Sequence, residues 1–489
     1  MAGVEAAFLG IDVGTASSKA VLVSDRGDVL ASAQRPHGSA SPRPNQFEHD
    51  AEAIWWGDVR ALIAELGPAA GGARGICVSG IGPCALITDE EGDPLRPAIL
   101  YGIDGRATEE IETLTAALGE EAIEERCGNR LTTQSVGPKL AWLERHEPEV
   151  RRRARRWHSC SSFVARRLTG RHVLDHYTAS TAEPLYDVAA HTWWDRGWEA
   201  AAPGLTPPDL AWPGDVVGTV TARAAGETGL AEGIPVLAGS IDAVTEGDGV
   251  GVREPGDTVV MYGSTMFLIQ VLDRRRRHPG LWANDGTRPG RFSLAAGMAT
   301  SGLVTTWLAG IAGADVGDLV REAGSIPAGS EGLVLLPYFL GERTPLFDPE
   351  ARGCWLGLTI HHTRAHLYRS VLEGVAYGVR HNLEAMAEAG PPSRRLVAVG
   401  GGTRGDLWTQ IVSDVVGLPQ EVRAVTIGAA YGDARLVAEA LGVDTAAWNP
   451  IVHLVRPDAA NRERYEERYQ AYRRLYPLLA EEMHRLSRS

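Results

Sequence analysis

Two stretches of the chain, about 250 residues apart, show the same alternation of short apolar runs and small polar residues. In residues 8–23, two apolar runs flank a turn made of Asp, Gly, Thr, Ala and Ser. Residues 258–269 repeat this scheme around a turn of Tyr, Gly, Ser and Thr. Short apolar runs bounded by such residues are typical of buried strands joined by tight turns. The repeat at this spacing predicts two similar domains and excludes an array of short repeats.

The rest of the chain alternates between predicted strands and helices. The apolar pattern predicts further strands at 29–33, 75–79, 85–88, 333–336 and 396–399, and helices at 51–66, 364–384, 407–416 and 462–485. The last helix is heavily charged, so we expect it to lie on the surface. Strands that alternate with helices indicate an α/β fold. We place the domain boundary near Gly239, which divides the chain into residues 1–238 and 239–489.

Charge and cysteine content narrow the class of partner. The chain has 48 Lys and Arg against 62 Asp and Glu, and this net charge of −14 argues against a broad binding surface for nucleic acid. No run of about 18 apolar residues occurs, so no membrane span is predicted, and residues 1–20 lack the basic flank of a signal peptide. The five cysteines are dispersed and form no C-x-x-C pair, which is typical of reduced thiols. We therefore expect a cytoplasmic protein whose partners are small molecules.

The turns of the two repeated stretches carry residues that suit phosphate binding. The first contains Asp12, Gly14, Thr15 and Ser17, and the second contains Gly263, Ser264 and Thr265. Backbone N–H groups and hydroxyls of such a turn can point together at a phosphate, and a carboxylate at a strand end, here Asp12, can hold Mg²⁺. One such hairpin would more often serve turn geometry alone. Two of them, one per domain, can hold the β- and γ-phosphates of a nucleotide from opposite sides of a cleft.

Asp242 is the candidate general base. It follows the predicted strand at 235–237, and glycines lie beyond it at 247, 249 and 251. A carboxylate at a strand end beside flexible backbone is well placed to take a proton from a substrate hydroxyl. The same position also suits the N-cap of a helix. The residues alone leave both interpretations open.

A glycine-rich loop follows the predicted strand at 396–399. Gly400, Gly402 and Gly405 match the G-x-G-x-x-G fingerprint of dinucleotide-binding folds, and Glu421 lies at the distance expected of a ribose-binding acid. This loop lies near the C-terminus, however, and a nicotinamide-dependent dehydrogenase would leave the paired hairpins without a role. The same loop can instead pack under an adenine ring.

The sequence motifs of three other enzyme classes are absent or incomplete. His362 and His366 are four residues apart, but no Glu of the H-E-x-x-H type lies between them. Neither a G-x-x-x-x-G-K-[ST] loop nor a G-x-S-x-G elbow occurs, which argues against P-loop and serine-hydrolase mechanisms.

With these residues in view, the chain resembles the FGGY carbohydrate kinases of the actin-like ATPase superfamily over nearly its whole length, and it looks most like their xylulokinase branch. The most specific match is a family signature in residues 353–373, which reads Gly353-x-Trp355-x-Gly357-Leu358, a seven-residue gap, then His366-Leu367-x-x-Ser370-Val371-Leu372-Glu373. Residues 48–50, 138–143 and 341–345 also read like the family.

The resemblance implies two ribonuclease H-like domains with a cleft between them, ATP and Mg²⁺ as cofactors, and a small sugar or polyol as substrate. It assigns Gly14, Thr15 and Ser17 to the first phosphate hairpin, Gly263, Ser264 and Thr265 to the second, and Gly400, Gly401, Gly402 and Arg404 to the adenosine loop. The family's catalytic base falls on Asp242, and its polar substrate contacts fall near Asp104 and Arg106. A homodimer is compatible with the family, and the sequence leaves the oligomeric state open.

Departures from the family concern the substrate side. Residues 79–84 read Ser-Gly-Ile-Gly-Pro-Cys where xylulokinases usually have Ser-Gly-Gln-Met-His-Gly, so Pro83 and Cys84 stand beside the expected sugar. The segment 101–106 is one residue longer than the usual W-N-D-G-R, and Ala243 replaces the common Asn after the base. The identity of the sugar therefore stays open.

The hypothesis that follows is ATP-dependent phosphorylation of a hydroxyl on a small sugar, with a ketopentose such as xylulose as the expected substrate. Other ketoses or polyols remain as alternatives. An alternative from a different class is an actin-like nucleotide switch that binds a protein partner. Asp104, Arg106 and Asp242 favour the kinase, because a switch has no need of them.

Overall fold

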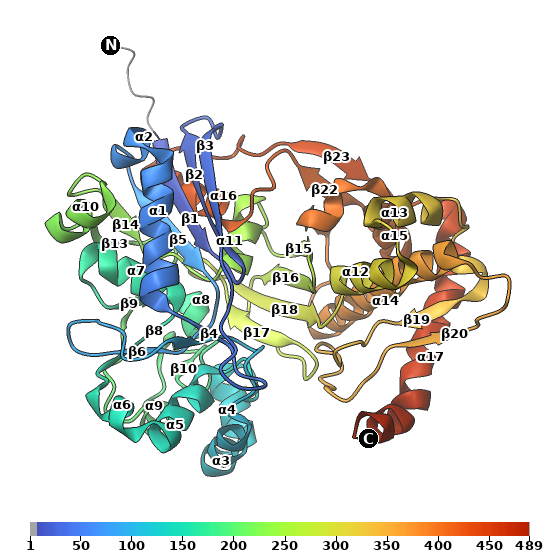
Figure 1. Ribbon diagram of the computed structural model, residues 1–489, viewed down its shortest axis with the longest axis horizontal. Coiled ribbons are helices and arrows are strands. Elements are labelled where there is room, and N and C mark those ends of the chain that lie inside the picture. Colours follow the sequence, from blue (N-terminus) through green and yellow to red (C-terminus); the bar gives the residue numbers. More distant parts are fainter. Residues whose placement is uncertain (1–6, 489) are drawn as a thin grey trace.

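Two mixed β-sheets form the centres of two lobes (Figure 1). The computed structural model describes residues 7–488. The first sheet comprises β1 (Ala7–Val13), β2 (Ser17–Ser24), β3 (Val29–Pro36), β5 (Ile76–Gly80), β13 (Val216–Thr219) and β14 (Pro235–Leu237). The second comprises β15 (Asp257–Tyr262), β16 (Met266–Leu272), β17 (Trp282–Asp285), β18 (Phe292–Met298), β21 (Arg395–Val399), β22 (Gln420–Arg423) and β23 (Ile451–Val455).

The two sheets share one topology. Their strand orders are β13-β14-β5-β1-β2-β3 and β17-β18-β16-β15-β21-β22-β23. β1 pairs antiparallel with β2 and parallel with β5, and β15 pairs in the same way with β16 and β21. Every residue of β1 is buried, as expected of a central strand with an almost continuous apolar sequence. The shared order confirms the predicted α/β fold with two ribonuclease H-like domains and explains why one strand–turn–strand pattern occurs twice in the sequence.

Helices and short strands complete the first lobe. The helices are η1 (Ala51–Trp56), α1 (Gly57–Leu66), α2 (Pro68–Gly71), α3 (Thr108–Leu118), α4 (Glu120–Cys127), α5 (Val136–His146), α6 (Pro148–Arg153), α7 (Cys160–Thr169), α8 (His176–Ala179), α9 (Asp195–Ala201) and α10 (Ala222–Thr228). The short strands are β4 (Glu48–His49), β6 (Leu86–Thr88), β7 (Ala98–Ile99), β8 (Arg156–His158), β9 (Val173–Asp175), β10 (Tyr186–Asp187), β11 (Thr192–Trp193) and β12 (Asp209–Ala211). Asp50 caps the helix predicted at 51–66, since its carboxylate accepts hydrogen bonds from the Glu52 and Ala53 amides.

The second half of the chain contributes α11 (Asp242–Gly249), α12 (Gly302–Ala312), α13 (Val316–Gly324), η2 (Ser330–Gly332), β19 (Val334–Leu336), β20 (Cys354–Leu356), α14 (Arg364–Ala389), η3 (Gly401–Arg404), α15 (Asp406–Val416), α16 (Ala429–Ala440), η4 (Ala459–Asn461) and α17 (Arg462–Ser487). The expectation that the last helix lies on the surface is only half right. α17 exposes its charged residues but buries Tyr465, Tyr469 and Tyr472 in the same hydrophobic core as α14. Within residues 7–488, no single helix has the length and apolar character of a membrane span, and only α12 and α13 taken together, bent by 97°, reach it.

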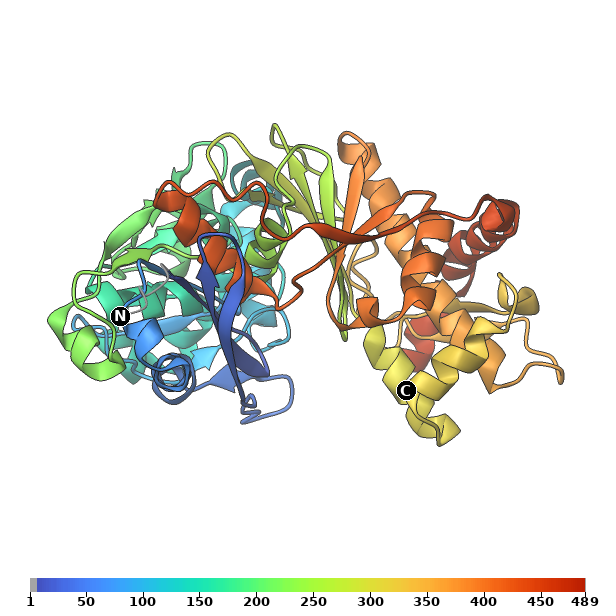
Figure 2. The same ribbon diagram turned by 90° about the horizontal axis from the view of Figure 1, so that it is seen from above.

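One helix from the second half of the chain packs on the sheet of the first lobe. Figure 2 shows the orange-red segment around α16 lying within the blue and green lobe. α16 lies against β1 and β5 and against α11. Its approach is so close that a Cβ on Gly10 of β1 would be 1.9 Å from the Ala430 carbonyl oxygen, and one on Gly432 would be 2.0 Å from that of Thr245. Only glycine fits at these two crossings.

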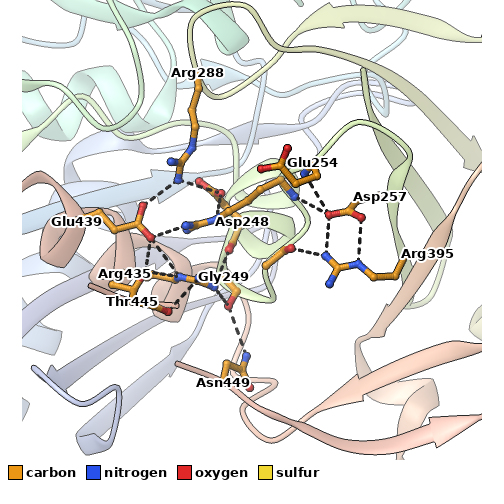
Figure 3. A network of polar contacts seen from close by, with 12 residues as sticks. Asp248, Gly249, Glu254, Asp257, Arg288, Arg395, Arg435, Glu439, Thr445 and Asn449 are labelled. Carbon is orange, nitrogen blue, oxygen red and sulfur yellow. Dashed lines mark hydrogen bonds and ion pairs between the residues drawn. The ribbon is translucent and has the colours of Figure 1, made fainter. Parts of the chain in front are cut away.

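A network of buried and half-buried ions continues this junction into the second lobe (Figure 3). Asp248 at the end of α11 pairs with Arg253 at 2.8 Å. Glu439 of α16 pairs with Arg288, from the loop between β17 and β18, at 2.8 Å, and with Arg435 at 3.3 Å. The network therefore joins α11, α16 and the second sheet.

We expect Gly432→Ala to lower the free energy of unfolding by about 1–3 kcal/mol, because the added methyl group meets the α11 backbone, which cannot rotate away. Denaturant titration measures the change. Gly310→Ala in α12 is the matched control, since a Cβ there meets nothing within 4 Å. This control should gain up to about 1 kcal/mol from the higher helix propensity of Ala. Equal effects of the two substitutions would contradict the close packing of α11 on α16.

Candidate active site

A cavity of about 260 Å³ lies between the two lobes. Three of the residues that surround it are the predicted phosphate-binding residues Thr15 and Thr265, one from each hairpin, and the candidate base Asp242, which is the first residue of α11. The rest of its wall is formed by Ile81, Gly82, Pro83, Tyr101, Ile103, Gln134, Tyr177, Thr181, Glu183, Ile241, Ala243, Phe267, Trp282, Asn284, Ala295 and Arg343. The fold thus brings together both hairpin turns and the candidate base, which are far apart in the sequence.

The first hairpin turn is held in shape by hydrogen bonds. The Gly14 amide donates to the Ser17 carbonyl oxygen at 3.1 Å and closes the turn. The His37 ring contacts the Gly14 carbonyl oxygen at 3.0 Å and the Asp58 carboxylate at 2.8 Å. These contacts hold residues 14–17 at the end of the cavity, where Thr15 also approaches the Tyr101 hydroxyl at 3.3 Å.

The second hairpin turn is held by the start of a helix. The amides of Gly302 and Leu303 in α12 donate to the carbonyl oxygens of Gly263 and Ser264 at 3.0 and 3.1 Å. The first amides of a helix have no partner within the helix itself, so the turn supplies acceptors that α12 needs. The result is a fixed position for Gly263, Ser264 and Thr265.

Four carboxyl groups gather where β1, α11 and α16 meet: Asp12, Asp242, Glu246 and Asp433. Burial raises the pKa of Asp242 to about 6 and that of Asp433 to about 8. Burial and the neighbouring Asp242 raise the pKa of Glu246 to about 7. The pKa of Asp12 is raised well above its ordinary value by burial, then by Asp242 and Asp433. Lys19 acts in the opposite direction on Asp12 and Glu246.

Asp433 and Glu246 are members of this site that the sequence analysis missed. The Asp433 carboxylate accepts hydrogen bonds from the Ser79 amide at 3.0 Å, the Ser79 hydroxyl at 2.6 Å and the Cys77 thiol at 3.1 Å. The sequence feature that could have revealed Asp433 is an acidic residue inside the otherwise apolar segment 427–434. Glu246 lies one helical turn after Asp242, a spacing that places both on one face of α11.

The carboxylates fit a divalent cation. The Oδ1 atom of Asp12 is buried and has no hydrogen-bond partner in the described part of the chain. A buried anionic oxygen without a partner is costly unless a cation faces it. Carboxylate oxygens are the ligands that Mg²⁺ prefers, so the residues present suit the ion that the sequence analysis expects at Asp12.

The predicted substrate residues divide into two groups. Pro83 lines the cavity, whereas Cys84 is completely buried behind it. Asp104 and Arg106 form a buried ion pair with 2.7 Å between Nη2 and Oδ2, and Arg106 also pairs with Glu48 at 2.7 Å. Neither side chain is among those that line the cavity. Further polar side chains on its wall are Gln134, Thr181, Glu183, Asn284 and Arg343, and the sequence analysis assigned a role in substrate binding to none of these five.

The predicted adenosine loop lies against the second hairpin. Gly400 has a φ of 91°, which L side chains rarely adopt, and a Cβ there would be 2.6 Å from the Tyr262 carbonyl oxygen. Gly402 packs equally closely on Tyr262, which directly precedes the hairpin turn. Gly401 faces open space, and Arg404 ends η3. The loop therefore packs beside the second hairpin turn, and its assignment to adenosine stays a prediction.

The dinucleotide-binding alternative disagrees with the topology. A Rossmann fold binds its cofactor on an open, mostly parallel sheet. The sheet that carries Gly400 contains the antiparallel run β15-β16-β18-β17. The glycine pattern alone therefore does not indicate a nicotinamide cofactor.

Comparisons with known proteins agree with this topology. The model of the FGGY family of carbohydrate kinases, N-terminal domain, matches residues 7–246, and that of the C-terminal domain matches residues 258–441. The xylulose kinase of Escherichia coli (strain K12) is 29% identical over 489 residues, which cover 97% of this chain and 100% of the relative. The xylulose kinase of Streptomyces coelicolor is 31% identical over 481 residues, with 93% and 94% covered. The predicted boundary near Gly239 stays a prediction.

Solved structures show the same likeness. The crystal structure of xylulose kinase from Rhodospirillum rubrum matches with a TM-score of 0.90 and 34% identity, over 98% of this chain and 100% of that one. The structure of Plasmodium falciparum glycerol kinase with ADP matches with a TM-score of 0.86 and 19% identity, over 96% and 97% of the two chains, and at that identity it shows the fold alone.

The buried carboxylates make stability depend on pH. The pKa of Glu246 is raised in the folded protein, so folding favours the neutral acid, and stability falls as the pH rises through about 7. Glu246→Gln mimics the neutral acid. Without nucleotide or divalent cations, we expect this substitution to raise the free energy of unfolding by about 1 kcal/mol at pH 8 and to leave it unchanged at pH 4.

Thermal unfolding at the two pH values measures this difference. Glu481→Gln, at an exposed position of α17, is the control and should change stability equally little at both. A loss of stability in Glu246→Gln at pH 8 would show that the ionised carboxylate stabilises the fold, contrary to the expected direction.

Proposed function

We propose that this chain, which belongs to the FGGY family of carbohydrate kinases, transfers the γ-phosphoryl group of ATP to a hydroxyl of a ketopentose such as xylulose. The observation that carries the proposal is that Thr15, Thr265 and Asp242 surround one cavity between the lobes. Two phosphate hairpins and a carboxylate that face one space are what phosphoryl transfer to an alcohol needs. The full-length similarity to xylulose kinases supports the choice of sugar.

Asp242 is the proposed general base. Its pKa of about 6 leaves the carboxylate ionised at neutral pH but close enough to the working pH to accept a proton. The hydroxyl oxygen of the sugar attacks the γ-phosphorus, and its proton passes to Asp242. The bond between this phosphorus and the β–γ bridging oxygen breaks, so ADP leaves with the electron pair.

The remaining residues position the reactants. The turns at 14–17 and 263–265 present amide groups to the phosphates from opposite sides, and their hydrogen bonds to His37 and α12 keep them in place. The loop at 400–404 holds the adenosine. Asp12 is the residue that would hold Mg²⁺, which neutralises charge on the β- and γ-phosphates when it is bound.

The cavity wall decides which sugar enters. Ile81 and Pro83 stand where xylulokinases usually carry polar residues, and they place apolar surface on one side of the cavity. Gln134, Asn284 and Arg343 supply hydrogen-bond donors on the remaining wall. A polyhydroxylated substrate can use these donors, and a ketose or polyol other than xylulose is the alternative that this altered wall favours.

A coupled assay of ADP release over pentuloses, hexuloses, pentitols, tetritols and glycerol tests the proposal. We expect the highest kcat/KM with D-xylulose. A maximum with another ketose or polyol would contradict the proposed sugar but retain the kinase. The nucleotide-switch alternative predicts slow ATP hydrolysis that no sugar accelerates, and that outcome would contradict the kinase itself.

Asp242→Asn should lower kcat by about 10²- to 10⁴-fold, because the amide cannot accept the proton of the hydroxyl. ATP binding, measured by calorimetry, should stay nearly unchanged, since the nucleotide contacts lie on the hairpins and the glycine-rich loop. Asp273→Asn, an exposed pair partner of Arg274, is the control and should retain full kcat. Full turnover in Asp242→Asn would refute the assignment of the base.

A further inference from the structure

Two histidines and an aspartate meet where the first lobe contacts the edge of the second sheet. His176 begins α8, His191 lies in the turn between β10 and β11, and Asp285 ends β17. One donor atom from each of the three side chains lies within 4.8 Å of the others. In the described residues, this is the one group of three or more His, Cys, Asp or Glu side chains with such spacing. The pair His362 and His366 is not part of any such group.

His176 and Asp285 are buried and His191 is half-buried, and the Tyr186 hydroxyl lies among the donor atoms of all three. The His191 Nδ1 atom is 3.1 Å from the Asp285 carboxylate, and the Tyr186 hydroxyl donates to the same oxygen at 2.8 Å. Tyr186 also lies 2.7 Å from the Nδ1 atom of His176. The Asp285 side chain is fully buried, yet its Oδ1 atom has no hydrogen-bond partner in the described part of the chain.

An unpartnered buried carboxylate oxygen beside two imidazoles points to a cation. Imidazole nitrogen is a ligand for zinc, copper, iron and nickel, whereas Mg²⁺ and Ca²⁺ prefer sites made of oxygen alone. Two His and one carboxylate, with a further position left to water, form a ligand set that Zn²⁺ uses in proteins. We propose that His176, His191 and Asp285 form a site for one divalent transition-metal ion, with Zn²⁺ as the expected occupant.

The surroundings suit such an ion. The Trp212 ring lies 4.4 Å from the His176 ring and 5.6 Å from the His191 ring, centroid to centroid. This ring and Tyr186 limit the rotation of both ligands, as the groups around a bound metal commonly do.

The site joins the two lobes beside the substrate cavity. Both histidines belong to the first lobe and Asp285 to the second sheet. Their chain neighbours Tyr177 and Asn284 line the cavity on its two sides. A bound ion therefore fixes these two parts of the wall relative to each other. The inference concerns a different place from Asp12 and holds whichever sugar the enzyme accepts.

Metal binding by the untagged, full-length protein tests the site. The protein is dialysed against EDTA and titrated with Zn²⁺ by calorimetry in excess Mg²⁺, which occupies the oxygen site at Asp12. We expect one Zn²⁺ per chain, a higher melting temperature with Zn²⁺, and a visible absorption band with Co²⁺ in place of Zn²⁺. A wild-type protein that takes up no Zn²⁺ under these conditions would overturn the proposal.

Variants locate the ion. His191→Ala and the milder His191→Asn should each lose at least tenfold in Zn²⁺ affinity and lose the Co²⁺ band, since each removes a ligand. Tyr186→Phe keeps all three ligands and should weaken binding about tenfold. His453→Ala, at an exposed position of β23, is the matched control and should bind as the wild type does. Unchanged affinity in both His191 variants, with circular dichroism that shows them folded, would overturn the site.

Discussion

The contact between α11 and α16 is the constraint on which the rest of the site depends. Two helices approach so closely only where one of them carries glycine, and Gly432 meets the Thr245 carbonyl at the crossing. Gly10 allows the same approach between α16 and β1. Asp242 lies three residues before Thr245 in α11, and Asp433 directly follows Gly432 in α16. The packing therefore brings acids from three distant parts of the chain to the end of one sheet.

Bringing these acids together sets the electrostatics of the site. Like charges at short range in a buried site cannot all ionise, so protons or a cation must compensate them. Asp433 has three hydrogen-bond donors directed at its carboxylate, yet burial still raises its pKa to about 8. Asp242 accepts one such bond, from the Ala243 amide, and its pKa is about 6. Of the four acids, Asp242 is the one that lines the cavity, and a pKa of about 6 leaves it ionised at neutral pH, which suits a general base.

The sequence predicted what local patterns determine. Strands and turns at 8–23 and 258–269 follow from apolar periodicity and small residues, and their repetition indicated the duplicated fold. Asp242 stood out because it follows a strand and precedes glycines. For Asp433 the local pattern showed only an acid inside an apolar segment, and it did not indicate the partners Ser79 and Cys77, which lie about 350 residues earlier in the chain. Contacts between distant segments cannot be read from periodicity.

The predicted substrate contacts show a second limit of sequence patterns: a matching residue type does not show whether its side chain faces the ligand. Asp104 and Arg106 match the family pattern at the level of residue type, and their opposite charges satisfy each other inside the first lobe. A buried, bidentate pair of this kind has little capacity left for a ligand. Ile103, the chain neighbour of Asp104, does line the cavity, so the ion pair supports this part of the wall. In the proposed function, specificity then rests on the side chains that line the cavity, while the proposed base stands on α11, so the wall can change from one relative to another without moving the base.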